Sequence, residues 1–431
     1  MHHLSPVAFI SRTRILMAGI VSLIGLLTLS TPAQSQQLAS YIWYSSGTEH
    51  VVYIGADSHI HELYSSGNGQ WQQNDLTSNT CRTIIKFNPP GSSVRPAITP
   101  AITGPLAANP YGAIAGFVWT GDNSQHVTYV GQDGHLHDLS YNSGTCWTNT
   151  DLTVQVPNTS LPDASTGIAS YDWPQDASEH FIYKGQDGFI HEIYKGLTTG
   201  WGRSDFTGYP TAAGPVAGYA WPQDNSEHII YMSSGGGLNE LYLNLGGSWG
   251  LNNGFNGQAY SALGTALTGF VWPEDGTEHI DYIVEASQTP YELYYATNQG
   301  WNDALVSNNK NDPHGAAYNS QAISGYIWPS DHSEHVLVID FNGHLHEYYL
   351  NRNGDHQWHD NDVTGSAAGN PPVANPSGVS GFAWDSKGIE HAFYFDCNGH
   401  VNDAWYIGFA QWQNVDLTQT TGAYPAFGCS N

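Results

Sequence analysis

The chain has 431 residues and a formal net charge of −27, and only 11 % of its residues are charged, whereas glycine, tryptophan and tyrosine are abundant. This composition is typical of short strands and tight turns and disfavours an architecture of long helices. The scarcity of basic residues argues against a nucleic-acid partner and against binding to an anionic membrane surface.

The first 35 residues have the pattern of a signal peptide. Arg12 and Arg14 precede an apolar run, and small residues follow that run at a position suited to cleavage. A membrane anchor is the less favoured alternative, because the run is short for a full span. We therefore expect an exported protein, secreted or periplasmic, with a mature chain of residues 36–431 and no membrane insertion.

A repeat of about fifty residues fills the rest of the chain and occurs seven times. Each copy opens with a tryptophan: Trp43, Trp119, Trp173, Trp221, Trp272, Trp328 and Trp384. A histidine follows seven residues later: His50, His126, His180, His228, His279, His335 and His391. An acid follows 12 residues after the histidine, or 13 in the fifth copy: Glu62, Asp138, Glu192, Glu240, Glu292, Glu347 and Asp403. A second tryptophan closes each copy: Trp71, Trp147, Trp201, Trp249, Trp301, Trp358 and Trp412.

The fourth copy shows how each repeat is expected to fold. Strands are predicted over 217–221, 228–232 and 238–243, with a fourth starting near Trp249, and turn-forming residues separate them. Four strands in hairpin succession make one propeller blade. A parallel β-helix has shorter coils and a sandwich does not repeat its sequence. The sequence therefore predicts an all-β fold, a seven-bladed β-propeller of four-stranded antiparallel blades.

The blade boundaries follow from the repeat. We place the blades at approximately 40–77, 114–153, 168–207, 216–256, 267–307, 323–364 and 379–418. Residues 78–113 are rich in proline and glycine and are expected to form a long inter-blade loop, an insertion more readily than a lid. Because all copies begin in the same phase, the ring is expected to close by stacking of the first and last blades, without a shared strand.

Four cysteines, Cys81, Cys146, Cys397 and Cys429, are present. An even number in an exported protein predicts two disulfides, and three pairings are possible. Proximity along the ring favours Cys81–Cys146 and Cys397–Cys429. No two are close in sequence, which disfavours metal binding through them.

The histidine and the acid of each repeat are the first functional candidates. They lie in the second and third strands, so their side chains could meet across a hairpin. A half-buried hydrogen bond of this kind in every blade would be structural, yet binding sites also repeat in propellers, and both interpretations stay open. The closing tryptophans follow a turn, where a ring can stay partly exposed and offer a platform to the apolar face of a sugar.

The remaining aromatic residues and histidines of the repeat are expected to pack between blades or, less readily, to bind a metal. The opening tryptophans, and the tyrosine that follows the histidine by three residues in six copies, are expected between blades. Three His-x-His pairs could each chelate a metal, because alternate residues of a strand share one face. These pairs are His59/His61, His135/His137 and His344/His346. Other copies replace the first histidine, so we expect neither a metal site nor a cofactor.

The repeat combines a polar residue that opens Val-x-Tyr, an Ile-x-Glu motif twelve residues later, and a Gly-rich turn followed by Trp. This pattern is similar to that of the six-bladed fucose-binding lectins of fungi and bacteria. It covers residues 40–418 as a repeat. In that family an arginine and a glutamate grip the sugar and aromatic residues of a neighbouring blade stack on it. The resemblance implies that the seven histidines, the seven acids and the closing tryptophans hold these places. Histidine replaces arginine throughout, so the bidentate fork is missing. With seven repeats, the chain resembles the seven-bladed bacterial lectins in architecture.

These observations favour a secreted, multivalent carbohydrate-binding protein without catalytic activity, with glycans or glycoconjugates as partners. A protein-interaction scaffold that uses one propeller face is the alternative. A glycoside hydrolase or lyase is less favoured, because the acids occupy equivalent positions and no blade carries a distinctive extra pair. The sequence carries no signal for an oligomeric state.

Overall fold

The described strands form seven four-stranded antiparallel sheets, and the strands of each sheet are hydrogen-bonded in sequence order. The computed structural model describes residues 37–81, 107–110, 112–143, 146–257, 262–284, 287–297, 299–306, 322–369, 371–408 and 411–429. All of these belong to one unit, residues 33–431. The expected signal peptide (1–35) and most of the expected loop 78–113 lie outside the described residues.

Each blade consists of four consecutive strands. Those of blades 1 to 4 are β1 (Leu38–Trp43), β2 (Thr48–Ile54), β3 (Ile60–Ser65), β4 (Gln72–Asp75), β5 (Ile114–Trp119), β6 (Ser124–Val130), β7 (Leu136–Tyr141), β8 (Thr148–Asp151), β9 (Ile168–Trp173), β10 (Ser178–Lys184), β11 (Ile190–Gly196), β12 (Gly200–Asp205), β13 (Ala212–Trp221), β14 (Ser226–Ser233), β15 (Leu238–Asn244) and β16 (Gly250–Asn253). Those of blades 5 to 7 are β17 (Ala262–Trp272), β18 (Thr277–Val284), β19 (Pro290–Ala296), β20 (Gly300–Leu305), β21 (Ser324–Trp328), β22 (Ser333–Ile339), β23 (Leu345–Asn351), β24 (Trp358–Asp362), β25 (Ala374–Trp384), β26 (Ile389–Asp396), β27 (Val401–Ile407) and β28 (Gln413–Asp416). The described helices are all short: α1 (Leu152–Gln155), α2 (Val363–Ser366), α3 (Leu417–Thr421), η1 (Phe255–Gly257), η2 (Pro329–Asp331) and η3 (Asp385–Lys387).

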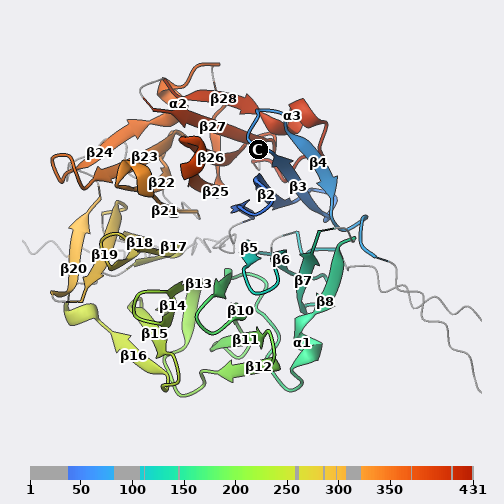
Figure 1. The fold of residues 1–431 in the computed structure, drawn as a ribbon, viewed down its shortest axis with the longest axis vertical. Coiled ribbons are helices and arrows are strands. Elements are labelled where there is room, and N and C mark those ends of the chain that lie inside the picture. The colour runs from blue at the N-terminus through green and yellow to red at the C-terminus, as the bar shows by residue number, and fades with distance from the viewer. Residues whose placement is uncertain are drawn as a thin grey trace, which may run out of the picture. The chain divides into compact units, whose positions relative to one another are not determined.

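The blades close into a ring (Figure 1). The innermost strands of successive blades contact one another from β1 to β25, and β25 in turn contacts β1. The first sheet contains only β1–β4 and the last only β25–β28, so the ring closes by stacking and shares no strand. The predicted seven-bladed propeller is therefore confirmed.

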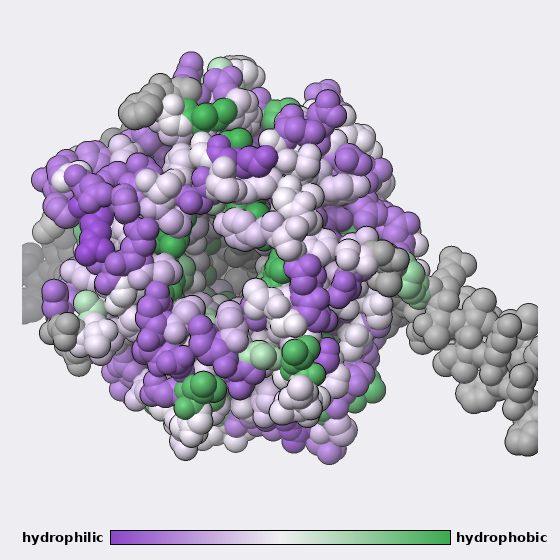
Figure 2. All heavy atoms as spheres, viewed as in Figure 1, coloured by the Kyte–Doolittle hydropathy of each residue, from purple (hydrophilic) through white to green (hydrophobic). Residues whose placement is uncertain are grey.

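The hydrophobic core lies between blades. Each core cluster joins residues of two neighbouring blades, as Ile230 of β14 and Ile280 of β18 illustrate. The second strand of a blade is buried almost throughout, because both of its faces pack on a neighbour. On the face drawn in Figure 2 hydrophilic residues predominate around a central hollow. Within the described residues, no helix is long and apolar enough to span a membrane.

A glycine in the innermost strand permits the close approach of blades. A Cβ atom added to Gly218 would lie 2.6 Å from the ring of Tyr171 in the preceding blade. Gly116 faces Tyr41 in the same way, at 2.7 Å. The sequence pattern Gly-aromatic-x-Trp therefore indicates a close contact between blades in addition to a strand.

The carboxy-terminal tail fastens the seam between the last and first blades. The Tyr53 hydroxyl donates to the carbonyl oxygen of Tyr424 at 2.6 Å, and the Ala56 N–H donates to that of Pro425 at 2.9 Å. The disulfide Cys397–Cys429 ties the tail to blade 7. The other disulfide is Cys81–Cys146, so both pairs are those that proximity along the ring favours.

Candidate functional site at the blade interfaces

In every blade the histidine of the second strand meets the acid of the third. The Nδ1 atom donates to the carboxylate over 2.5 to 3.0 Å in six blades, and His279 and Glu292 make the same contact in blade 5. In blade 1, His50 stands opposite Tyr64 and Glu62 stands opposite Val52, so the pair is diagonal on one face of the sheet. The expected contact across the hairpin is present in all seven blades.

A hydroxyl occupies the other ring nitrogen in six blades. The residue two positions before the histidine bonds Nε2 at 2.6 to 2.7 Å: Thr48, Ser124, Ser178, Ser226, Thr277 and Ser333. Blade 7 has Ile389 in this position. There, His391 Nε2 lies 3.2 Å from Glu49 Oε2 of blade 1.

A second acid, which was not among the predicted site residues, reaches six of the seven histidines from the next blade. It is the residue directly before the next blade's own histidine. The pairs are His126–Glu179, His180–Glu227, His228–Glu278, His279–Glu334, His335–Glu390 and His391–Glu49, at 2.9 to 3.2 Å. Between blades 1 and 2, Gln125 stands in this position and accepts from the Tyr41 hydroxyl at 3.0 Å. A glutamate before the histidine in six of seven copies was the signal that could have revealed these residues.

The resulting triads are buried, which shifts their pKa values. Burial raises the pKa of Glu227 to about 7 and that of Glu278 to about 8. Burial alone would lower the pKa of His180 and of His228, but the neighbouring carboxylates overcome this and raise the values to about 10 and about 9. Each imidazolium is therefore shared between carboxylates of two blades, and the triad links those blades electrostatically.

The interface between blades 4 and 5 contains an open pocket of about 450 Å³, here called the 4/5 pocket. His228 and Glu240 of blade 4 line it together with Glu278 and the closing Trp301 of blade 5. Asn252 donates to Glu240 at 2.9 Å and so holds the second carboxylate oxygen. The remaining lining residues are Trp221, Asp224, Tyr242, Asn244, Leu251 and Tyr295.

A second pocket of about 420 Å³, the 7/1 pocket, lies at the seam. It combines His391 and Asp403 of blade 7 with Glu49 and the closing Trp71 of blade 1. Ile389, Gly67, Asn68, Gly69, Trp405, Ile407 and Val415 complete its lining. Both pockets thus join the histidine–acid pair of one blade to the closing tryptophan of the next.

The closing tryptophans are less exposed than the sequence suggested. Trp147, Trp301, Trp358 and Trp412 are buried, and Trp71, Trp201 and Trp249 are half-buried. They pack on the blade before them: Trp71 is edge-on to Phe393 and Trp249 to Phe206. The opening tryptophans are buried, as expected for packing between blades.

Two solved structures resemble this chain over most of its length. The BP39L lectin from Burkholderia pseudomallei matches with a TM-score of 0.64 and 18 % identity, covering 88 % of this chain and 98 % of that chain. The fold is that of the β-propeller lectins. The fucose-specific lectin from Aleuria aurantia matches with a TM-score of 0.50 and 14 % identity, covering 78 % of this chain and 98 % of that chain. No protein-family model matches the chain, and no curated protein sequence does.

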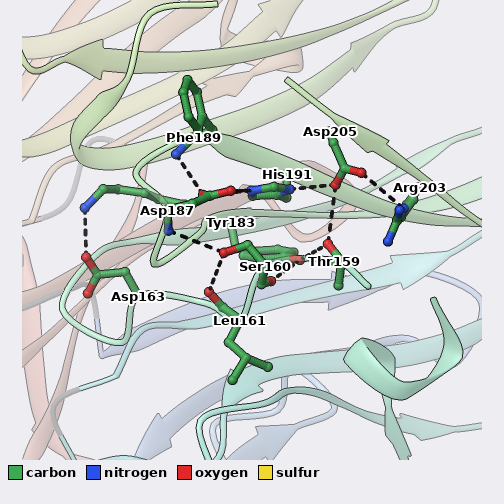
Figure 3. A network of polar contacts seen from close by, with 11 residues as sticks. Thr159, Ser160, Leu161, Asp163, Tyr183, Asp187, Phe189, His191, Arg203 and Asp205 are labelled. Carbon is green, nitrogen blue, oxygen red and sulfur yellow. Dashed lines mark hydrogen bonds and ion pairs between the residues drawn. The ribbon is translucent and has the colours of Figure 1, made fainter. Parts of the chain in front are cut away.

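The His-x-His residues of this propeller are hydrogen-bonded to aspartates. The pairs are His59–Asp75, His61–Asp57, His135–Asp151, His137–Asp133, His344–Asp362 and His346–Asp360, at 2.8 to 3.2 Å. In blade 3, His191 lies between Asp187 and Asp205, at 3.0 and 2.7 Å, and Arg203 in turn contacts Asp205 (Figure 3). Asp151 also caps α1. These contacts connect the third strand and the turn before it to the outer strand of the blade, and two of these groups, Asp133/His135/Asp151 and Asp340/His344/His346, each bring three potential metal ligands together.

Proposed function

We propose that the protein is a secreted, multivalent carbohydrate-binding protein without catalytic activity. One observation carries this proposal: the 4/5 and 7/1 pockets each bring a carboxylate acceptor, a histidine and a tryptophan together across a blade interface. Carboxylates and ring nitrogens hydrogen-bond sugar hydroxyls, and aromatic rings pack on the apolar face of the sugar ring. Its two disulfides suit an oxidising compartment outside the cytoplasm.

Under this proposal all seven histidine–acid pairs have a structural role, and two of them also bind ligand. All seven tie the second strand of a blade to the third, because they are buried and hydrogen-bonded, and six of the histidines also contact a glutamate of the next blade. The pairs His228–Glu240 and His391–Asp403 also line open pockets, where glycans would bind beside Trp301 and beside Trp71. Two or more weak sites on one body gain affinity for a surface that displays many copies of the glycan.

Two matched variants test the proposal. Glu240→Gln changes a pocket acid, and Glu192→Gln changes the equivalent acid of blade 3. Both break a buried charge-assisted hydrogen bond and should lower stability similarly, by about 2 kcal/mol. Calorimetric titration with a glycan selected on a glycan array should show that Glu240→Gln alone loses one binding site per molecule, while melting curves report the stability of both variants.

The outcome separates the two roles of the pair. Unchanged stoichiometry and affinity in Glu240→Gln, with lowered stability, would leave these residues purely structural and remove the proposed site. An array on which the wild-type chain binds no glycan would overturn the carbohydrate-binding function itself.

A further inference from the structure

The 4/5 pocket is unusually acidic and aromatic. Three carboxylates line it, those of Asp224, Glu240 and Glu278. Against them stands one histidine, His228, and no lysine or arginine belongs to the lining. Even with Glu278 protonated, two carboxylates face one imidazolium, so the pocket keeps a net negative charge.

Blades 2, 3 and 6 also have an aspartate in the position of Asp224, namely Asp122, Asp176 and Asp331, whereas two other blades have a basic residue at or near it. Between blades 5 and 6, Arg352 pairs with Asp275, the equivalent of Asp224, at 2.5 Å. In blade 7 the equivalent residue is itself a lysine, Lys387, which lies over the Trp384 ring. Asp224 is exposed and, within the described residues, its recorded side-chain partner is the hydroxyl of Ser226. The 4/5 pocket has therefore kept an acid that blades 5 and 7 neutralise or replace.

Four aromatic side chains surround these carboxylates. Trp221 and Tyr242 come from blade 4, and Tyr295 and Trp301 come from blade 5. The Tyr295 ring packs edge-on to Trp221, with ring centroids 6.1 Å apart, and also contacts Trp301 at 5.5 Å. Aromatic faces combined with carboxylates attract ammonium groups, through the ring quadrupole and through direct charge.

The wall of the same pocket contains an unpartnered hydrogen-bond donor. The indole nitrogen of Trp221 is buried, at 2 % exposure of the residue, and has no hydrogen-bond partner among the described residues. The opening tryptophans Trp119, Trp173, Trp272 and Trp328 have the same unpartnered, buried indole nitrogen. Both oxygens of Glu240 and Oδ1 of Asp224 keep a second lone pair beyond the bond from His228, Asn252 or Ser226, so an ammonium donor can be accommodated there.

We infer that the 4/5 pocket selects glycans that carry a free amine, that is, amino sugars in their cationic form. This inference rests on the proposed carbohydrate-binding function and narrows it for one site. The 7/1 pocket supplies the contrast, because its lining holds two acids, Glu49 and Asp403, and a wall of Ile389, Ile407 and Val415. Of these two pockets, the 4/5 pocket therefore has the larger excess of acids.

The test compares three sugars that differ at one substituent. The full mature chain, in buffer with EDTA at mildly acidic pH, is titrated calorimetrically with glucosamine, glucose and N-acetylglucosamine. Because an ionised donor strengthens the hydrogen bond, glucosamine should bind about tenfold more tightly than glucose. Acetylation removes the charge and should remove this advantage. Added salt should weaken the binding of glucosamine and leave that of glucose unchanged.

Three variants test whether the preference for glucosamine depends on Asp224. Asp224→Asn should reduce the preference for glucosamine over glucose several-fold, and Asp224→Lys, which copies the residue of blade 7, should abolish it. Asp275→Asn removes the equivalent acid outside the pocket and should leave the preference intact. Equal binding of glucose and glucosamine, absence of glucosamine binding, or a preference that survives Asp224→Lys would each overturn the inference. Binding of the wild-type chain to a glycan array decides the broader function separately.

Discussion

The residue-scale feature of this propeller is a buried triad that repeats around the ring. A histidine of one blade shares its proton with an acid of the same blade and, at six interfaces, with a glutamate of the next. At the remaining interface Gln125 replaces that glutamate, which shows that an amide is tolerated there. The triads are therefore electrostatic ties between blades, and their protonation governs stability.

We predict that the protein is most stable near about pH 5 and loses stability as the pH rises. Glu227 (pKa about 7), Glu278 (about 8), His180 (about 10) and His228 (about 9) all have folded-state pKa values above those of the unfolded chain. Each group's contribution is complete below its unfolded pKa and is lost as the pH rises through its folded pKa. The loss should begin above about pH 4.5 with the glutamates and continue to about pH 10 with the histidines. Thermal melts across this range give the measurement.

At the acidic end of the pH range, the stability of the protein is expected to fall as the pH decreases. Hydrogen bonds from Lys184 and Ser165 help to lower the pKa of Asp163 in the folded chain, against the effect of burial. Such a group contributes stability above its unfolded pKa that is lost as the pH falls further. A melting temperature that stays level or rises between neutral and alkaline pH would contradict the expected profile. Glu227→Gln, which copies the natural Gln125, should flatten part of the alkaline decline.

At the scale of the single element, the innermost strand depends on glycine. Gly218→Ala places a methyl group within 2.6 Å of the Tyr171 ring, and this aromatic ring stacks on His180 within its own blade. The blades must separate or the ring must turn, so we predict a loss of about 1 to 3 kcal/mol. Chemical denaturation measures it. Gly208→Ala is the control, because a Cβ atom there meets no neighbour, and an equal loss in both variants would refute the packing argument.

The repeat predicted the elements well because each element is local. The order of strands in a blade and the contact of His50 with Glu62 lie within one copy of the motif, and the number of copies gives the number of blades. In the fourth copy, β13 starts at Ala212, five residues earlier than predicted, because a bulge between Ala212 and Val216 lets the strand continue. Propensity does not foresee such an irregularity.

The candidate site was predicted less completely, because it forms between copies. Glu278 reaches His228 from the next blade, fifty residues away in the sequence, and the repeat alone does not say which neighbour a side chain faces. The repeat also does not show which blade interfaces contain an open pocket. Trp301 and Trp71 line the 4/5 and 7/1 pockets and Trp249 lines neither, although all three occupy the same position in the motif and each packs edge-on against a phenylalanine.

At the scale of the whole molecule, the ring has one seam. No strand crosses it, so stacking, the tail and the disulfide Cys397–Cys429 hold blade 7 to blade 1. We predict that Cys429→Ser, which opens a loop with a sequence separation of 32, lowers the free energy of unfolding by about 3 kcal/mol. Denaturant titration under oxidising conditions should show this. A midpoint equal to that of the wild type would mean that the tail is dispensable for closure.

The order of the blades also fixes how the two pockets are oriented. Three blades separate the 4/5 pocket from the 7/1 pocket in one direction around the ring and four in the other, so the two openings lie on nearly opposite sides. A short oligosaccharide cannot span that circumference. With both pockets occupied, the molecule would hold two separate chains and act as a cross-linker, drawing particles into aggregates instead of gripping a single patch of one surface.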